Sequence, residues 1–508
     1  MKNKRLYNIG MAAAIVVPLL FSSCSDSFLD VTPPDKATVD EYYTTAPHIY
    51  EALTAAYNPM RIYDWNGTQY APLNLCSDVM ADDILAGGSG ISDNQYLHKM
   101  ANYSSTENSS DALTGIWDNS FNGVRDCNDV ITYCANNAGK LDAATLKEYD
   151  AEARVLRAFY YCQLWKFYGN IPFYMSNLSE PYAANQTAPD DVYKNVITDL
   201  ETVIDENILP LQWDNNNLGR WSQAAAYMLY AEMVMYQNDE TRYSKALGYM
   251  QAIIKSGKFS LTPNYADIWK ESGEWNSESI FEINYSDDKG ARSWSWVHGA
   301  GGTVYPRLIG PSDWQGGLGI DKGWGFGTVR TECYNMFNAN DTRRGATCFD
   351  ARNAKYTKRY EDTGFFQDKY IPMTANNKDQ IADADLNFNN NLRIYRYAET
   401  LLNAAELLLR TNGSTSDAQE YLNMVHHRAG LTDNVAATID NIINERHLEF
   451  VGEGKRYWDL IRTGKAAATL VPDTEGWRTN SWTESKKYLP IPLSEIDRAQ
   501  NTLIQNKY

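Results

Sequence analysis

Apolar residues recur at helical spacing along most of the chain. Between Ala151 and Tyr168 they stand at Val155, Phe159, Cys162 and Trp165, which is the 3.6-residue period of an amphipathic helix. The same pattern predicts further helices, and a short β-branched run predicts one strand at Ile280–Asn284. The other predicted helices are Val39–Tyr57, Ala112–Cys134, Asp190–Glu206, Trp221–Tyr236, Tyr243–Ile254, Ile394–Leu409 and Ala418–Ala429.

These helices follow one another in pairs of roughly 30 to 40 residues, which is the scale of a tetratricopeptide unit. Such units bury their apolar stripes only by stacking on one another. No strict repeat consensus is present, so an irregular helical domain is the alternative. We predict a mainly α fold, built of tetratricopeptide-like helical pairs with large irregular loop regions.

Two stretches break the helical pattern and are rich in aromatic residues. Arg292–Gly327 holds four of the 14 tryptophans and ten of the 32 glycines. Glycine at this density, together with Pro306 and Pro311, excludes a long helix. Arg61–Ser110 is a second such stretch and carries Trp65 and Tyr96 among others. Loops on a rigid scaffold are where binding residues concentrate.

The N-terminus has the features of an export signal. Three basic residues precede an apolar run, Ile9–Phe21, which is too short to cross a bilayer. Small residues then precede Cys24, as in a bacterial lipoprotein signal, so we expect residues 1–23 to be removed and Cys24 to be lipidated. An ordinary signal with a chance cysteine is the alternative.

The net charge and the spacing of the remaining cysteines argue against two classes of function, nucleic-acid binding and zinc binding. Removal of three basic residues with the signal changes the net charge from −18 to −21, which argues against nucleic acid as a partner. Six other cysteines lack the paired CxxC spacing of zinc sites. Cys127 and Cys134 lie about 10 Å apart along one predicted helix and cannot bridge each other. Other disulfide pairings stay open.

Motifs of common enzyme and metal sites are absent from the sequence. It contains no HExxH helix, no GxxxxGK[ST] phosphate loop and no GxSxG turn. Asp383, Asp385 and Asn387 are spaced as in a calcium loop, but Phe388 and Ile394 replace the glycine and the glutamate that such a loop needs. We predict no catalytic residue, no metal ligand and no cofactor.

A glycoside hydrolase is the enzymatic alternative, because such an enzyme needs two carboxylates that flank one bond. Several acidic residues lie in or near the loop regions, although acidic residues are common in this chain. They are Asp78, Asp82, Asp83, Glu278, Glu282, Asp287 and Asp313.

Carbohydrate binding fits the loop composition better. Trp and Tyr stack on the apolar faces of a pyranose, while polar side chains bind its hydroxyl rim. The alternative is that the tryptophans pack inward and order the glycine-rich loops. The predicted glycan-binding residues are Trp294, Trp296, Trp314, Trp324, Trp65 and Tyr96.

Five blocks of the sequence resemble the SusD/RagB family of lipoproteins. They occur in the family's order, and the resemblance spans the chain from Cys24 to the last residue. They are EARVLRAFYYCQLWKFYGNIPF (152–173), WGFGTVRTECYNMF (324–337), IYRYAETLLNAAE (394–406), INERHLEFVGEGKRYWDLIR (443–462) and the ending YLPIP (488–492) with QNKY (505–508).

The resemblance implies a surface lipoprotein of the outer membrane that captures oligosaccharides and hands them to a SusC-like TonB-dependent transporter, without chemistry. It implies one SusD-like domain over 24–508, with an N-terminal region at 24–235 and a C-terminal SusD/RagB region at 280–508. A scaffold subunit with no small ligand is the third functional hypothesis. The charged residues of the block 443–462 recur at helical spacing, so we expect them to form a structural network between helices.

Overall fold

The computed structural model describes residues 38–66, 70–106, 110–180, 184–287, 292–297, 301–377, 382–499 and 502–508. The predicted signal segment 1–23 and Cys24 therefore lie outside the described residues.

The fold is mainly α, as the sequence predicts. Long helices pack in succession, each against the next: α5 on α6, α6 on α7, α7 on α8, α8 on α9, α9 on α13, and α13 on α14. This order gives the stacked helical layer that the paired apolar stripes require. The bounds are α5 Ser110–Asn136, α6 Ala143–Tyr168, α7 Pro189–Glu206, α8 Gln223–Gln237, α9 Tyr243–Lys255, α13 Tyr397–Arg410 and α14 Thr415–Arg428.

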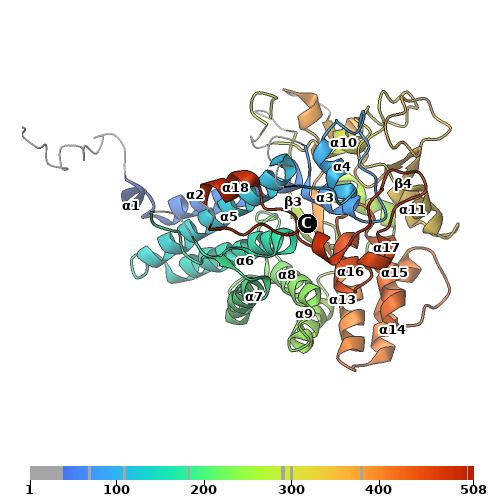
Figure 1. Cartoon of the computed structure of the whole chain (residues 1–508). Helices are drawn as coiled ribbons and strands as arrows, with labels where there is room; N and C mark the ends of the chain where they lie inside the picture. The colour runs from blue at the N-terminus through green and yellow to red at the C-terminus, as the bar shows by residue number, and fades with distance from the viewer. Residues whose placement is uncertain are drawn as a thin grey trace, which may run out of the picture.

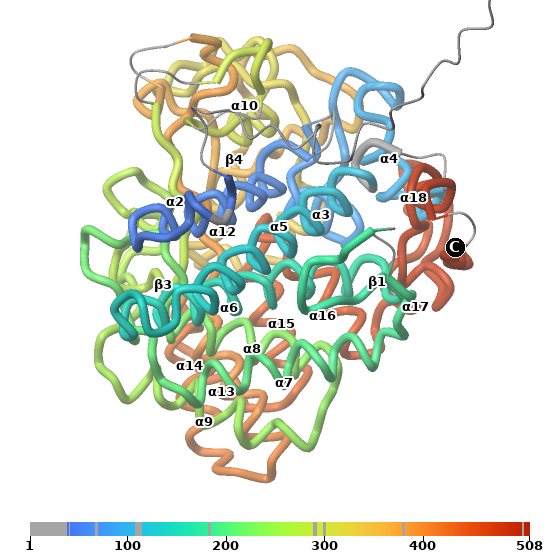
Figure 2. The backbone as a smooth tube through the Cα atoms, turned by 90° about the vertical axis from the view of Figure 1, so that its left-hand side faces the viewer, coloured from blue at the N-terminus to red at the C-terminus, as the bar shows by residue number. Residues whose placement is uncertain are grey.

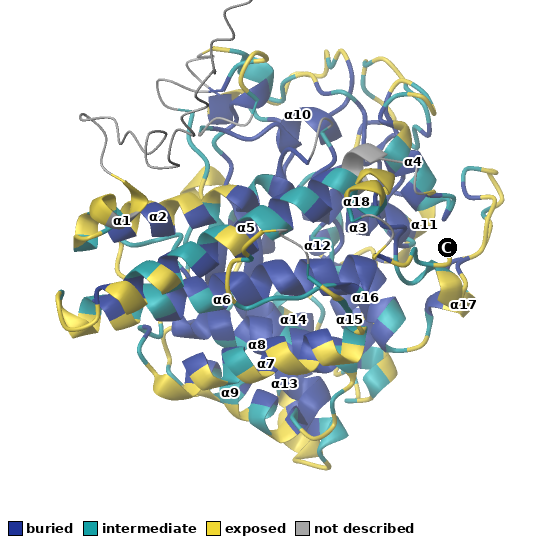
Figure 3. Ribbon diagram, turned by 60° about the vertical axis from the view of Figure 1, so that its left-hand side comes forward, coloured by how far each residue is buried: buried dark blue, intermediate teal, exposed yellow. Residues whose placement is uncertain are grey.

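Helix α6 lies in the middle of this layer. The Asp142 side chain accepts a hydrogen bond from the Thr145 backbone N–H at 2.8 Å and caps its first turn. Gly169 ends it with a φ of 67°, where a Cβ atom would lie 2.8 Å from the Tyr488 ring. Trp165 is buried as predicted and contacts the rings of Tyr193 and Tyr236. In Figure 3 the central α6, α8 and α16 are buried, and α7 and α9 expose their outer sides.

The irregular segments gather on the side opposite the helical layer. In Figure 1 and in the turned view of Figure 2, α10 lies in the upper part of the molecule, and α9, α13 and α14 lie in the lower part. The helices outside the stack are α10 Tyr305–Ile309, α11 Thr331–Met336, α12 Arg343–Thr347, α15 Ile439–Glu449, α16 Arg456–Arg462, α17 Ala466–Thr469 and α18 Leu493–Arg498. Single 3₁₀ turns are η3 Tyr265–Trp269, η4 Glu271–Gly273, η5 Thr374–Asn377, η6 Ala384–Leu386 and η7 Glu484–Lys486.

The N-terminal part differs from the sequence prediction in two places. The single helix predicted at Val39–Tyr57 is two helices, α1 Val39–Tyr42 and α2 Ala46–Tyr57, because the Thr45 side chain caps a new first turn that carries Pro47. The stretch Arg61–Ser110 contains more regular structure than predicted. All eight residues of α3 are buried. The added elements are η2 Asn58–Tyr63, α3 Leu73–Met80 and α4 Gln95–Ala101.

Small antiparallel sheets connect the loops. The predicted strand at Ile280–Asn284 is confirmed as β3, Ser279–Ile283, and it pairs with β6, Leu392–Arg396. The prediction of a helix from Ile394 was therefore wrong at its start: the chain is extended to Arg396 and becomes helical at Tyr397. The other pairs are β1 Ile171–Pro172 with β2 Gln186–Thr187, and β4 Cys348–Asp350 with β5 Phe365–Gln367.

The predicted charged network is present and is larger than expected. Glu449 on α15 is fully buried and pairs with Arg343 of α12 at 3.1 Å, with Arg396 of β6 at 3.0 Å, and with Arg428 of α14. Burial alone would raise the pKa of Glu449, but the surrounding cations, led by Arg428 and Arg396, lower it to about 2.

A second part of this network joins the last helices to the stack. Arg462 of α16 pairs with Glu406 of α13 at 2.6 Å, and Arg446 of α15 pairs with Asp459 of α16 at 2.8 Å. The network thus connects helices that are distant in the sequence, which is a structural role. Among the described residues, no helix has both the length and the apolar character needed to cross a membrane.

Candidate functional site

Four aromatic rings from two distant parts of the chain meet among the loops. We call Trp65, Tyr70, Trp294 and Trp324 the aromatic cluster. The Trp294 and Trp324 ring centroids are 6.0 Å apart with their planes at 24°, so these two indoles are stacked. Tyr70 lies 5.1 Å from Trp324, and Trp65 lies 6.0 Å from Trp294 at 72°, so Trp65 and Tyr70 support the stacked pair.

Exposure differs strongly within the aromatic cluster. Trp294 exposes 48% of its surface, while Trp65 exposes 5%. Tyr70 and Trp324 are half-buried. The cluster therefore has one indole at the surface and a buried ring that holds it in place, which is the arrangement of an open stacking platform.

A buried ion pair joins the two parts of the chain that carry the cluster. Arg292 donates to the Asp64 carboxylate, and both side chains are 3% exposed. Asp64 also accepts hydrogen bonds from the Thr303 hydroxyl and the Val304 N–H, each at 2.6 Å. Because Asp64 precedes Trp65 and Arg292 lies two residues before Trp294, this pair fixes the two indoles relative to each other.

The three residues that are spaced as in a calcium loop, Asp383, Asp385 and Asn387, contact the loops that carry the aromatic cluster. The Asp383 carboxylate accepts a hydrogen bond from the Trp294 N–H at 2.7 Å. Asn387 exchanges two hydrogen bonds with the Arg292 backbone, at 2.8 and 3.0 Å, and Asp385 pairs with Arg307 at 2.8 Å. These side chains hold the Arg292–Val297 segment and its surroundings through direct contacts.

Polar groups border the rings. The Tyr70 hydroxyl donates to Asp93 at 3.1 Å, and burial followed by the Asp93 charge raises the pKa of Tyr70 to about 12. Arg359 lies beside Gly325 and donates to the Ser312 hydroxyl at 2.8 Å. Asp93 and Arg359 are both partly exposed, and the second Asp93 oxygen accepts hydrogen bonds from the Ser89 N–H and hydroxyl at 2.9 and 2.8 Å.

The structure brings three of the six predicted binding residues together: Trp65, Trp294 and Trp324. Trp314 packs instead against Phe349, with centroids 5.3 Å apart, and its indole N–H donates to the Gly317 carbonyl at 2.9 Å. Trp296 is 61% exposed and closes a turn on Ser293. Tyr96 is half-buried on α4 under the Lys99 ammonium group. The binding role of all six stays a prediction.

Sequence reasoning missed Tyr70, Asp93 and Arg359 as neighbours of the tryptophans. Tyr70 lies in the aromatic stretch that the sequence already singles out, which is the one local signal for it. Tyr70 contacts both Trp324 and Phe326, and Phe326 forms a backbone bridge with Gly87; local sequence patterns do not reveal these contacts.

Five of the seven acidic residues of the enzymatic alternative have structural partners: Asp78, Asp82, Asp83, Glu278 and Glu282. Glu278 is buried and pairs with Arg396 at 2.5 Å and Arg428 at 2.7 Å. Glu282 is buried and accepts hydrogen bonds from the Trp275 N–H and the Ser279 hydroxyl. Carboxylates held in this way are not arranged on either side of an open sugar site.

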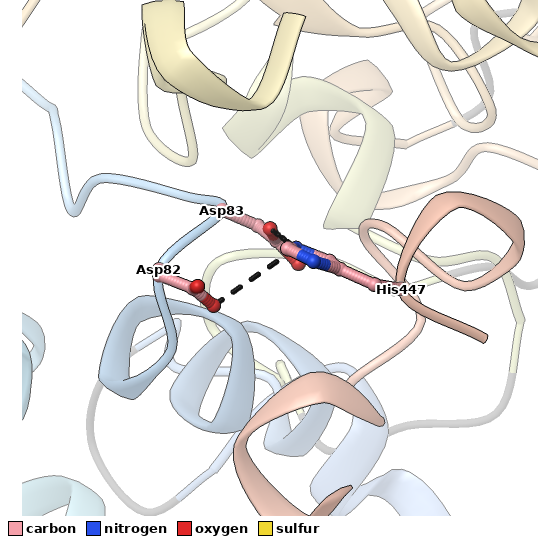
Figure 4. Close-up of side chains that lie close together, drawn as sticks. All are labelled: Asp82, Asp83 and His447. Carbon is pink, nitrogen blue, oxygen red and sulfur yellow. Dashed lines mark hydrogen bonds and ion pairs between the residues drawn. The ribbon is translucent and has the colours of Figure 1, made fainter. Parts of the chain in front are cut away.

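Asp82, Asp83 and His447 form a compact group, shown in Figure 4. One ligand atom from each lies within 4.8 Å of the others, a spacing that a metal ion could use. Arg456, however, donates two hydrogen bonds to Asp82, at 2.8 and 3.0 Å. Burial would raise the pKa of Asp82, but Arg456 and His447 lower it to about 2. The group therefore ties α15 to the segment after α3 through compensated charges.

Comparisons with known proteins give a consistent result. A family model described as the SusD family matches residues 202–508, which is more than half of the chain. A second model, described as starch-binding associating with outer membrane, matches residues 27–235.

Solved structures and a curated relative agree with these family models. Surface glycan-binding protein A from Bacteroides thetaiotaomicron, in complex with laminarihexaose, is 52% identical, with a TM-score of 0.86 over 91% of this chain and 99% of that one. A laminarin-binding SusD-like protein is 28% identical, with a TM-score of 0.80 over 91% and 98%. SusD-like protein P25 of Formosa agariphila is 25% identical over 95% of both chains.

Proposed function

Because the chain belongs to the SusD family, whose members compared above are glycan-binding proteins rather than enzymes, we propose that it captures an oligosaccharide on the aromatic cluster and hands it to a SusC-like TonB-dependent transporter. In this proposal the first 23 residues are a signal peptide, Cys24 carries the lipid, and residues 24–508 form one SusD-like domain at the cell surface.

The stacked pair Trp294–Trp324 is the observation that carries this proposal. A pyranose presents an apolar C–H face that an indole covers, and its hydroxyl rim needs polar partners. Trp294 exposes half of its surface, Trp324 lies nearly parallel to it at 6.0 Å, and Asp93 and Arg359 stand at the border. An aromatic surface with a polar border is what binding of a chain of sugar rings needs.

We propose a glucose oligosaccharide of the laminarihexaose type as the ligand. The support comes from two similar proteins: a 52% identical one whose structure contains laminarihexaose, and a laminarin-binding one that is 28% identical. An open surface lets water compete with the sugar, so we expect a dissociation constant of roughly micromolar to millimolar.

The test is calorimetry with laminarihexaose on a chain that begins after Cys24. Trp294→Ala removes the exposed stacking ring and should weaken binding by about tenfold to a hundredfold, as removal of one binding ring does elsewhere. Because Trp294 is half exposed, the melting temperature should stay close to that of the wild type.

Tyr50→Ala is the control, since it removes an exposed ring on α2 that is neither in the aromatic cluster nor among the predicted binding residues. Equal affinity of Trp294→Ala and wild type would overturn the assignment of the site. Absence of any binding by the wild type to laminarihexaose, mannan or xylan oligosaccharides would favour the scaffold hypothesis.

A further inference from the structure

Two of the cysteines lie against each other. The described residues contain six unbonded, buried cysteines. Cys333 is the third residue of α11 and Cys348 is the first residue of β4, and each exposes 2% of its surface. The Cys333 and Cys348 side chains interact directly, and this contact, followed by burial, raises the pKa of Cys333.

The surrounding contacts place α11 on the β4–β5 hairpin independently of the sulfur atoms. The ring of Tyr334, which follows Cys333, stacks on Phe365 of β5 with centroids 4.1 Å apart. Phe365 is opposite Asp350 in the register of β4 and β5, and its carbonyl accepts a hydrogen bond from the Val329 N–H at 2.9 Å. The helix that carries Cys333 thus contacts β5, the strand that pairs with the strand of Cys348.

We propose that Cys333 and Cys348 are joined by a disulfide bond in the exported protein. This inference rests on the proposed export, because disulfides persist outside the cytoplasm and are rare within it. The two thiols lose two protons and two electrons to the disulfide of a thiol–disulfide oxidoreductase. An S–S bond forms between Cys333 and Cys348, and the oxidoreductase leaves as a dithiol.

The surroundings of the pair determine when the bond forms. A thiolate is the attacking species, and both the neighbouring thiol and burial disfavour the thiolate of Cys333. In the folded protein the reduced pair is also out of reach of an oxidoreductase. The bond therefore forms during folding, before the two cysteines are buried, and is afterwards protected from reductants.

The bond would fix one end of the segment that carries the aromatic cluster. Helix α11 follows directly on Trp324–Arg330. The chain between the two cysteines is short and contains α12, whose Arg343 pairs with Glu445 at 2.7 Å. A disulfide here links this segment, the hairpin and the charged network, and it restricts the unfolded chain.

Thiol trapping on the full chain purified from the cell envelope tests the proposal. The protein is quenched in acid, denatured, alkylated with N-ethylmaleimide without reductant, digested and analysed by mass spectrometry. We expect Cys76, Cys127, Cys134 and Cys162 to be alkylated, and the peptides of Cys333 and Cys348 to be linked. Alkylation of both Cys333 and Cys348 in exported protein overturns the proposal. Laminarihexaose affinity measured on the same sample then shows separately whether the proposed function holds.

Denaturation with and without reductant is the second measurement. Reductant present during unfolding should lower the midpoint of the wild type by about 2 to 4 °C. Cys333→Ala/Cys348→Ala should show no such response, and Cys127→Ala/Cys134→Ala, which removes two buried but unpaired thiols, should keep it. A wild-type midpoint that is the same with and without reductant contradicts the disulfide, whether or not the variants fold.

Discussion

At the scale of single residues, Gly87 lies where the two loop regions of the aromatic cluster meet. Its φ is 74°, and a Cβ atom would lie 2.4 Å from the Gly325 carbonyl oxygen. Its N–H donates to Glu361 at 2.9 Å. Only glycine accepts both this conformation and this approach without displacing the neighbouring backbone.

Gly87→Ala should therefore separate the segment next to Tyr70 from the segment of Trp324. We expect a loss of about 1 to 3 kcal/mol in the free energy of unfolding, together with weaker laminarihexaose binding. Thermal melts and calorimetry measure the two effects. Gly90→Ala is the control, because a Cβ atom there meets nothing within 4 Å. If Gly87→Ala behaves like Gly90→Ala, the bridge between Gly87 and Phe326 does not position the rings.

The tryptophans also show how far sequence reasoning reaches at this scale. Their density among glycines predicts an aromatic surface, and Trp294 and Trp324 do lie on one. The same density points equally to Trp314, which packs on Phe349. Trp294 differs from Trp314 in the Asp64–Arg292 ion pair beside it, a contact between residues far apart in the chain that local sequence patterns do not reveal.

At the scale of elements, the ion pairs of the charged network join α12, α14, α15 and β6 to one another. Glu449→Gln removes the negative charge that Arg343, Arg396 and Arg428 share. Three buried guanidinium groups then lack a common partner, and breaking a buried pair in this way costs about 3 to 5 kcal/mol.

Urea unfolding of Glu449→Gln measures this loss. Glu495→Gln is the control, since its partner Arg498 is largely exposed and such surface pairs contribute about 0 to 1 kcal/mol. A Glu449→Gln protein as stable as Glu495→Gln would show that the network does not stabilise the fold.

The buried carboxyl groups also predict how stability depends on pH. Glu449 and Glu232 have pKa values lowered to about 2: burial opposes this, but the cations around Glu449 and the lysines Lys166 and Lys455 beside Glu232 prevail. Their contribution is complete above about pH 4.5 and is lost as pH falls toward 2.

The contribution of Asp368 to stability changes with pH in the opposite direction, because burial raises its pKa to about 6. Its contribution is complete at low pH and is lost as pH rises from about 4 to 6. We expect the urea midpoint to be highest near pH 5, and Asp368→Asn, which stays neutral, to reduce the decline from pH 5 to 7. A midpoint that rises steadily from pH 5 to 8 would contradict this account.

Prediction from sequence succeeded for elements whose pattern is local. Most long helices have one apolar stripe that continues over several turns, so their periodicity identifies them. Helix α3 has only eight residues, and β6 runs without a turn into α13, so neither has a long periodic pattern that marks its bounds. The charged block 443–462 predicts a network because its spacing is helical, but its partners Arg343, Arg396 and Arg428 come from other elements.

At the scale of the whole molecule, the helical layer and the loops lie on opposite sides, as Figures 1 and 2 show. A glycan-binding surface on the loop side leaves the helical side free for contacts with other proteins. This arrangement fits a binding protein that stays at the cell surface, and the proposed attachment is then a single lipid on Cys24.

Cys24→Ala tests this attachment. The variant keeps the basic residues and the apolar run Ile9–Phe21, so we expect it to be exported, but without the modified cysteine it should leave the membrane pellet for the soluble fraction. Laminarihexaose affinity should equal that of the wild type, because Cys24 precedes the whole described fold. Ser23→Ala keeps the cysteine next to a small residue and should stay in the pellet. The measurement is fractionation of cells that lack the SusC-like transporter, so that binding to a partner cannot retain the protein. A Cys24→Ala protein that still sediments with the outer membrane in such cells would show that another part of the chain attaches it.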